Sequence, residues 1–237
     1  MSIYKFETHL HTAEVSACAV SSASEYVNAF LHAGYAGIII TDHFFNGNCG
    51  VYPFLSWEEK IDAFCYGYEN ALNAAQGTNL KVFFGIEYNF CGDEYLLYGL
   101  TQKQLKNMPQ IMQMSHAELF NAVNSLGGLV IQAHPFRRRR YIKKINLHPK
   151  DVHGVEVYNS GNHLTENYEA LEYAKQNNLV MTSGSDIHNV ANLFSDEQAK
   201  KLGLNKNGGI AFNAKIETIE DFINAIKSGE NYTILGF

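Results

Sequence analysis

The sequence has few cysteines, and they form no recognisable pair. Cys18, Cys49, Cys65 and Cys91 are widely spaced among 237 residues and include no C-x-x-C motif. The first residues have neither the basic segment nor the apolar core of a secretion signal. We therefore expect free thiols rather than disulfides, and a cytoplasmic protein.

Long apolar runs and an excess of positive charge are also absent. No stretch approaches the roughly 18 apolar residues of a membrane span. The 18 Lys and Arg against 24 Asp and Glu leave a formal net charge of −6, so neither an anionic membrane nor nucleic acid is an expected partner. The motifs G-x-S-x-G, H-E-x-x-H, G-x-G-x-x-G and the P-loop are missing as well. With a net negative charge, the attraction of any anionic substrate must be local.

The composition is that of a globular protein, with 46% hydrophobic and 18% charged residues. A chain of this length is within the range of one α/β barrel, and we expect a single domain over residues 1–237. Capping boxes begin three predicted helices, at Ser22, Ser56 and Ser115, each with a glutamate three residues later. The predicted helices span roughly 23–33, 57–76, 115–126, 166–177 and 219–228.

Continuous apolar runs between these helices predict strands that are buried on both faces. The runs lie at about 3–8, 36–41, 81–87, 128–133, 154–158 and 179–184, with further short strands at 208–212 and 232–235. Alternation of strands and helices implies right-handed crossovers and a parallel sheet, either open or closed into a barrel. The expected fold class is therefore α/β.

Residue types that bind metals end or follow five of these strands. They are His9 with His11, His43, Glu87, His134, and Asp186 with His188. The carboxyl ends of parallel strands open on one face, so ligands scattered along the chain can converge there. Six or seven nitrogen and oxygen donors exceed the need of one tetrahedral zinc. A cluster of two or three zinc, manganese or iron ions fits them better.

These stretches resemble the motifs of the polymerase and histidinol phosphatase (PHP) domain family. The segments that carry the resemblance, over about residues 3–190, are His9-Leu10-His11, Thr41-Asp42-His43, Gly85-Ile86-Glu87, Ala133-His134-Pro135 and Ser185-Asp186-Ile187-His188. The resemblance implies a distorted (β/α)7, TIM-like barrel with a trinuclear metal site at the carboxyl ends of its strands, in a phosphoesterase. It implies three sets of ligands, namely His9, His11, Glu87 and Asp186 for the first ion, Glu87 and His134 for the second, and His43 and His188 for the third.

Two positions of the family pattern are not matched. A carboxylate or histidine usually follows the H-x-H motif by a few residues, and here Glu14 is the substitute ligand for the third ion, with a solvated loop glutamate as the alternative. A histidine often follows the Gly-x-Glu motif, whereas this chain has Asp93 and Glu94. Either could serve, or the second ion could lack this ligand. The sequence is therefore compatible with two or three bound ions.

The implied reaction needs no protein nucleophile. Ions a few ångströms apart lower the pKa of a bound water, and the resulting hydroxide attacks phosphorus while the ions neutralise the departing oxygen. We assign catalytic roles to Asp42, Asp186 and His188. Asp42 either handles protons or orients an imidazole, and the orienting role is the favoured one.

A basic run and one further strand end supply candidate substrate contacts. Arg137 and Arg138 belong to a run of four arginines that begins three residues after His134, and guanidinium groups match phosphate oxygens bidentately. A solvated loop is the alternative interpretation of this run. Glu156 and Asn159 lie at the end of another strand, resemble the family's penultimate motif, and would face the site.

The preferred hypothesis is a metal-dependent phosphatase that hydrolyses a small phosphomonoester, with histidinol phosphate as the namesake example. A nuclease or cyclic phosphodiester hydrolase is the second hypothesis. A non-catalytic, metal-stabilised binding domain is the third, and the near-complete ligand set argues against it.

Overall fold

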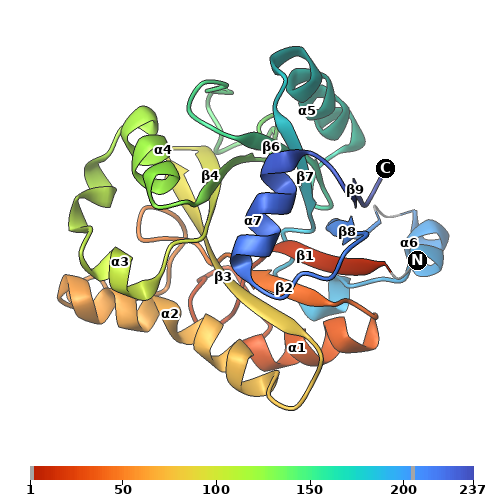
Figure 1. Cartoon of the computed structure of the whole chain (residues 1–237), viewed down its shortest axis with the longest axis horizontal. Coiled ribbons are helices and arrows are strands. Elements are labelled where there is room, and N and C mark those ends of the chain that lie inside the picture. Colours follow the sequence, from red (N-terminus) through yellow and green to blue (C-terminus); the bar gives the residue numbers. More distant parts are fainter. Residues whose placement is uncertain (1–2, 204–205) are drawn as a thin grey trace.

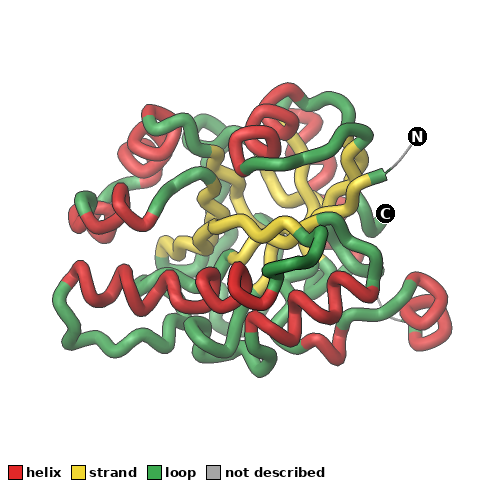
Figure 2. Tube along the Cα trace, turned by 60° about the horizontal axis from the view of Figure 1, so that its bottom comes forward, coloured by secondary structure: helices red, strands yellow, loops and turns green. Residues whose placement is uncertain are grey.

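The computed structural model describes residues 3–203 and 206–237. Seven strands follow one another around a nearly closed barrel, and helices surround them (Figures 1 and 2). The strands are β1 (Tyr4–Leu10), β2 (Gly37–Ile40), β3 (Lys81–Phe90), β4 (Asp93–Tyr98), β5 (Leu129–Ala133), β6 (Gly154–Asn159) and β7 (Val180–Gly184). This arrangement confirms the α/β barrel that the resemblance implied.

The barrel closes where β1 meets β7. Thr8 Oγ1 donates a hydrogen bond to the Ser183 carbonyl at 2.7 Å. The Asp186 N–H donates to the His9 carbonyl at 2.8 Å. Closure therefore brings the first and the last of the metal-binding motifs side by side, although they lie far apart in the sequence.

Five helices confirm the predictions made from capping boxes and glycine stops. They are α1 (Ala23–His32), α2 (Trp57–Ala74), α4 (His116–Ser125), α5 (Leu164–Asn177) and α7 (Ile219–Ser228). Ser22, Ser56 and Ser115 each accept a hydrogen bond from the backbone N–H of the glutamate three residues on, and that glutamate accepts one from the serine N–H. These bonds satisfy backbone groups that lack a partner in the first turn.

One strand departs from the expected parallel sheet. β4 was not predicted, and it lies antiparallel between β3 and β5. The chain reverses at Cys91 and Gly92, which have φ angles of 55° and 125°, so a tight hairpin replaces a helical crossover. Because both neighbours run opposite to β4, β3 and β5 stay parallel to each other and their carboxyl ends share one face.

Several short elements complete the chain. α3 (Gln102–Lys106), α6 (Asp196–Leu202) and the 3-10 turns η1 (Pro109–Gln113) and η2 (Val190–Asn192) were not predicted. β8 (Ile210–Phe212) and β9 (Tyr232–Ile234) confirm the predicted short strands and extend the sheet antiparallel from β1. Among the described residues, no helix combines the length and apolarity needed to cross a membrane.

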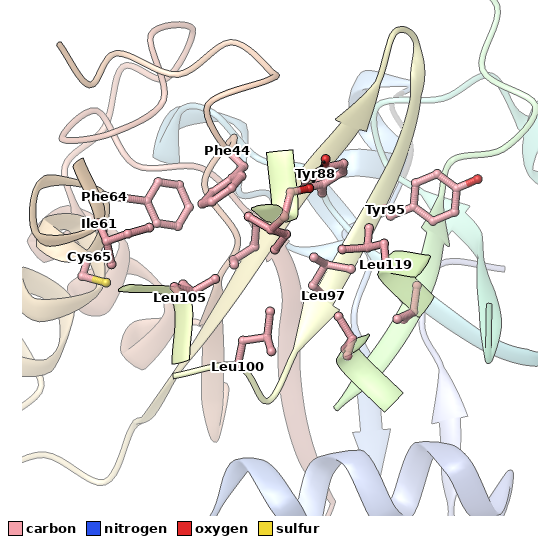
Figure 3. Close-up of a cluster of buried hydrophobic side chains, with 14 of the residues drawn as sticks. Phe44, Ile61, Phe64, Cys65, Tyr88, Tyr95, Leu97, Leu100, Leu105 and Leu119 are labelled. Carbon is pink, nitrogen blue, oxygen red and sulfur yellow. Dashed lines mark hydrogen bonds between the residues drawn. The ribbon is translucent and has the colours of Figure 1, made fainter. Parts of the chain in front are cut away.

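A buried apolar cluster lies between strands β3 to β5 and helices α2 to α4 (Figure 3). The ring of Phe44 packs at centroid distances of 5.1 Å from Phe64 and 6.0 Å from Tyr88. Full burial of such a ring stabilises the fold by about 1.5–3 kcal/mol. Phe44 directly follows His43, so this packing holds the histidine at the end of β2.

α7 covers the end of the barrel opposite the strand carboxyl ends (Figure 1). Its residues Phe222, Ile223 and Ile226 are buried. The Phe222 ring packs edge-on against Tyr98 at a centroid distance of 5.3 Å and against Phe212 at 5.8 Å. One end of the barrel is thus closed by apolar side chains, which leaves the other end for the site.

The substitution Phe222→Ala should lower the free energy of unfolding by about 3–5 kcal/mol, because removing a fully buried ring leaves a cavity. Urea unfolding followed by circular dichroism measures this change. Asn224→Ala, at an exposed position of the same helix, is the control and should shift stability by no more than about 0.5 kcal/mol. Equal effects of the two substitutions would contradict this account of the core.

Candidate metal centre

The predicted ligands meet at the carboxyl ends of the barrel strands. They are His9 and His11 on or just after β1, His43 after β2, Glu87 on β3, His134 after β5, and Asp186 and His188 after β7. Their side chains are at most 11% exposed, apart from that of His188 at 29%. The centre is therefore shielded from water and opens beside His188.

The two histidines of β1 face two carboxylates. His9 Nε2 lies 3.1 Å from Glu87 Oε1 and 3.5 Å from Asp186 Oδ1. His11 Nε2 lies 3.1 Å from Asp186 Oδ1 and 3.5 Å from Glu87 Oε2. These four side chains form a mixed set of imidazole and carboxylate donors, which zinc, manganese and iron all accept.

Glu87 also reaches the histidines of the neighbouring strands. Its Oε1 atom lies 3.2 Å from His134 Nε2, and its Oε2 atom lies 2.6 Å from His43 Nδ1. Glu94 Oε2 lies 3.6 Å from the same His134 nitrogen. Glu87 is therefore central to the cluster, where a carboxylate could bridge two ions.

Two histidines of the centre use Nδ1 in hydrogen bonds with oxygen acceptors. His9 Nδ1 lies 2.9 Å from Glu156 Oε1, and His188 Nδ1 lies 2.9 Å from the Asp186 carbonyl. Carboxylate and carbonyl oxygens only accept, so each Nδ1 carries a proton, and in the neutral imidazole the lone pair is on Nε2. Burial opposes a charge on His9, but the carboxylates of Glu156, Asp186 and Glu87 outweigh it and hold its pKa well above the ordinary value, so binding of a cation at Nε2 releases a proton. A lone pair on Nε2 is the form in which a histidine binds a metal.

His11 reaches the same state through a serine. Ser16 Oγ donates its only proton to Asp42 Oδ1 at 2.7 Å, so it can only accept from His11 Nδ1, 3.2 Å away. Burial and the nearby charge of His43 lower the pKa of His11 to about 3. The remaining contacts of the Asp42 oxygens are with the Thr12 N–H and hydroxyl, at 2.6 and 2.7 Å. These contacts support the orienting role for Asp42.

The cluster contains buried atoms that need partners. His9 Nε2, His11 Nε2, His43 Nδ1 and Glu87 Oε2 lie close to one another or to Asp186, but in positions that form no hydrogen bond, a condition shared by only two other buried side-chain atoms in the described residues. Such atoms are costly when left unsatisfied, and bound cations would satisfy all four. Groups whose ligand atoms lie within 4.8 Å of one another include His9–His11–Asp186, His9–Glu87–His134 and His11–His43–His188. The residues present therefore fit divalent metal ions.

Two of the ligands have an unusual backbone. His134 and Asp186 have φ angles of 29° and 55°, a region that non-glycine residues enter at a cost of about 1–3 kcal/mol. Hydrogen bonds hold both turns, from the His134 N–H to Glu156 Oε2 at 3.1 Å and from the Asp186 N–H to the His9 carbonyl at 2.8 Å. The fold thus maintains strain at positions that direct side chains into the centre.

The comparison with known families agrees with this geometry. The family model described as the PHP domain matches residues 7–200, which is most of the chain. The chain belongs to the PHP domain family. No curated protein matches the chain in sequence.

Solved structures share the fold at low sequence identity. A two-domain protein from Bacteroides vulgatus ATCC 8482, which contains a predicted PHP-like metal-dependent phosphoesterase, is 16% identical, with a TM-score of 0.72. The match covers 99% of this chain and 65% of that protein, so this chain spans less than two thirds of its length. A protein from Bifidobacterium adolescentis ATCC 15703, assigned as a metal-dependent phosphoesterase, is 16% identical over 83% of this chain and 94% of that one, with a TM-score of 0.57. PsfC from Pseudomonas syringae PB-5123 is 15% identical over 100% of this chain and 93% of that one, with a TM-score of 0.63.

In this PHP domain Glu156 and Asn159 lie behind the ligands. Both are at most 1% exposed. Besides its bond with His9 Nδ1, Glu156 accepts from the His134 N–H at 3.1 Å and from Asn159 Nδ2 at 2.9 Å. These bonds occupy the carboxylate, so it orients two ligands instead of facing a substrate as predicted.

Arg137 is the basic residue of the run that reaches the centre. Its Nη2 atom donates to Asp186 Oδ2 at 2.6 Å and to Asn159 Oδ1 at 2.8 Å, and its Nε donates to Asn162 Oδ1 at 2.8 Å. Asp186 is therefore shared, with Oδ1 toward the histidines and Oδ2 toward the guanidinium. The pKa of Asp186 is well below its ordinary value, because the charges of His9 and Arg137 outweigh the effect of burial.

Two predicted site residues lie elsewhere. The Arg138 guanidinium is exposed and donates to Glu169 Oε2 at 2.6 Å on α5. The Glu14 carboxylate accepts from the Ala23 N–H at 3.0 and 3.1 Å and from Asn70 at 3.4 Å. Glu14 therefore accepts from a backbone N–H group that would otherwise lack a partner at the start of α1. This contact accounts for its position away from the other predicted ligands.

The two candidates for the unmatched histidine point in opposite directions, as neighbours on a strand do. Glu94 faces His134. Asp93 accepts hydrogen bonds from His116 Nε2 at 2.7 Å and from the Tyr95 hydroxyl at 3.2 Å, on the other face of β4. Of the two, Glu94 is the one available to an ion beside His134.

Sequence reasoning missed Cys18. Its thiol lies within hydrogen-bonding reach of His43 and His188. Partial burial opposes ionisation, but these contacts outweigh it and lower the pKa of the thiol to about 6. The available signal was position, because Cys18 stands in the segment after H-x-H where the family has a carboxylate or histidine.

Sequence reasoning also missed Glu7, a lone glutamate that no pattern marks as buried. Glu7 is 0% exposed. It accepts from the Thr8 and His9 N–H groups at 2.9 Å, and from the Ser185 N–H at 3.0 Å and hydroxyl at 2.6 Å. Burial raises the pKa of Glu7 to about 7, and hydrogen bonds from Ser185 act against this rise.

In the metal-free protein, Glu7→Gln should flatten the dependence of stability on pH between 4.5 and about 7. The unfolded carboxyl, with its ordinary pKa of 4.5, ionises within this window while the folded one keeps its proton. Wild-type stability should therefore fall as pH rises, by up to about 3 kcal/mol, and the neutral amide should remove that loss. Urea unfolding at several pH values tests this. Parallel pH profiles for the two proteins would contradict it.

Proposed function

We propose that this PHP domain is a metal-dependent phosphoesterase that hydrolyses a small phosphomonoester with two or three zinc, manganese or iron ions. The observation that carries the proposal is the convergence of buried, unpartnered imidazole and carboxylate atoms at the open end of the barrel. Divalent ions at this position would lower the pKa of a water molecule and offset the charge that develops on the phosphoryl oxygens.

The protein's own contribution is to hold and orient the ligands. His9, His11, Glu87 and Asp186 would hold the first ion, Glu87, Glu94 and His134 the second, and His43 and His188 the third. Glu156 and the Ser16–Asp42 pair fix the imidazole tautomers of His9 and His11. Ligands prepared in this way need little rearrangement when ions bind, which favours tight binding.

A cavity beside the centre supports a small substrate. It has a volume of about 450 Å³ and is bordered by Asp186 and His188, which is within the usual range for small-molecule sites. Ser160, Asn162 and Asn192 are among the residues that line it. Neutral polar walls suit an alcohol portion that carries hydroxyl or amide groups. Histidinol phosphate is one candidate substrate of suitable size.

Arg137 supports binding of the phosphoryl group. Its side chain is 11% exposed and lies against Asp186. The bonds to Asp186, Asn159 and Asn162 use its Nε and Nη2 atoms, and no partner of Nη1 is found among the described residues. The free N–H groups can therefore donate to a phosphoryl oxygen next to the ions.

Protein purified without added metal or chelator should contain two to three zinc, manganese or iron ions per chain, measured by mass spectrometry. It should hydrolyse p-nitrophenyl phosphate faster than bis(p-nitrophenyl) phosphate. Asp186→Asn removes a ligand charge and should lower both the ion content and the turnover. It also removes the charged partner of Arg137, so the metal-free protein should melt at a lower temperature than the wild type. Preferred cleavage of the bis ester would point to the phosphodiesterase hypothesis. Fewer than one ion per chain after reconstitution, without turnover, would overturn the proposal.

Arg137→Lys should lower kcat/KM by about 10–100-fold, the usual cost of losing a residue that orients a metal ligand. A rise in KM at constant kcat would indicate phosphoryl binding, and a fall in kcat at constant KM would indicate that Arg137 mainly positions Asp186. Arg138→Lys is the matched control, because that neighbouring guanidinium contacts Glu169 at the surface. Unchanged kinetics of Arg137→Lys would exclude both roles.

A further inference from the structure

Cys18 is held in place by backbone and side-chain contacts on both sides of it. Two residues before it, Ser16 Oγ accepts a hydrogen bond from the His43 N–H at 3.0 Å. Two residues after it, the Val20 N–H donates to the His188 carbonyl at 2.8 Å. The segment is therefore attached to His43 at one end and to His188 at the other, and Cys18 lies between them.

The Cys18 side chain completes the contact. Its thiol lies within reach of the imidazoles of both His43 and His188. In the described part of the chain, Cys18 is the cysteine that lies beside predicted metal ligands. It is exposed at the edge of the metal centre. A sulfur in this position can reach the same ion as the two imidazoles.

His11 is an independent sign that a cation belongs here. Its ring stacks on those of His43 and His188, at centroid distances of 4.2 and 4.3 Å. Its Nε2 atom is buried and lies 3.1 Å from Asp186 Oδ1 in a position that forms no hydrogen bond, and the residue is 0% exposed. His11, His43 and His188 also form a group whose ligand atoms lie within 4.8 Å of one another. The site next to Cys18 thus already contains three imidazoles that are placed to bind one cation.

We propose that the Cys18 thiolate is a ligand of the ion held by His43 and His188, and that this site selects zinc or ferrous iron over manganese. The inference rests on the proposed function, because it concerns one ion of the same centre. Glu14, the carboxylate expected in this role, is engaged at the start of α1. Thiolate is a softer ligand than carboxylate and favours zinc and iron, whereas oxygen ligands suit manganese.

Cobalt substitution tests the ligand directly. Wild-type protein reconstituted with Co²⁺ should show the ultraviolet charge-transfer band of a thiolate bound to cobalt. The band should disappear in Cys18→Ser and Cys18→Asp and persist in the control Cys91→Ser, whose side chain is exposed in the turn between β3 and β4. Persistence of the band in Cys18→Ser would overturn the proposal.

Metal selectivity provides a second readout. Cys18→Ser should lose about one ion per chain, whereas Cys18→Asp should recover that ion with a preference shifted from zinc towards manganese. Equal ion content and selectivity in wild type, Cys18→Ser and Cys18→Asp would contradict the proposal.

Alkylation by iodoacetamide, followed by peptide mass spectrometry, gives a readout that does not depend on activity. Bound zinc should slow modification of Cys18 and leave that of Cys91 unchanged. Equal rates at Cys18 with and without zinc would argue against sulfur ligation. A protein that binds ions and hydrolyses phosphomonoesters without the cobalt band would overturn this inference alone. A protein that binds no ions would overturn the proposed function.

Discussion

The structure depends on the seam at which β1 meets β7. Glu7 lies at this seam and accepts hydrogen bonds from both sides, from the His9 N–H and from the backbone and hydroxyl of Ser185. The Asp186 N–H completes the seam by donating to the His9 carbonyl. A residue that joins the two strands therefore also sets the distance between the first and last ligands. Separation of β1 from β7 would open the barrel and, at the same time, move the metal-binding residues of the two strands apart.

A layer of polar residues behind the ligands determines what the centre can bind. Glu156 and the Ser16–Asp42 pair place protons on the Nδ1 atoms of His9 and His11, which directs both Nε2 atoms towards the carboxylates. The same layer holds the positive φ angle of His134 through Glu156. Buried networks of this kind are stable only when nearly every member is satisfied. The unpartnered atoms lie on the side where ions would bind, which links the fold to the chemistry of the family.

The sequence predicted the elements that local interactions control. Capping boxes located the starts of α1, α2 and α4, because a serine and a glutamate three residues apart satisfy each other's backbone regardless of the rest of the fold. The antiparallel strand β4 escaped prediction. Its direction depends on the turn at Cys91 and Gly92, and an apolar run does not reveal which way a strand runs.

The sequence by itself determined which residue types could bind metals and that they lie at the ends of strands, since H-x-H and similar motifs are readable from spacing. Tertiary structure decided which neighbouring residues belong to the centre. Glu14 caps a helix, Arg138 pairs with Glu169, and Cys18 contacts two imidazoles. These outcomes depend on where loops lie once the barrel has closed. A short polar segment has no periodicity that fixes its direction, so only contacts between distant parts of the chain select its partners.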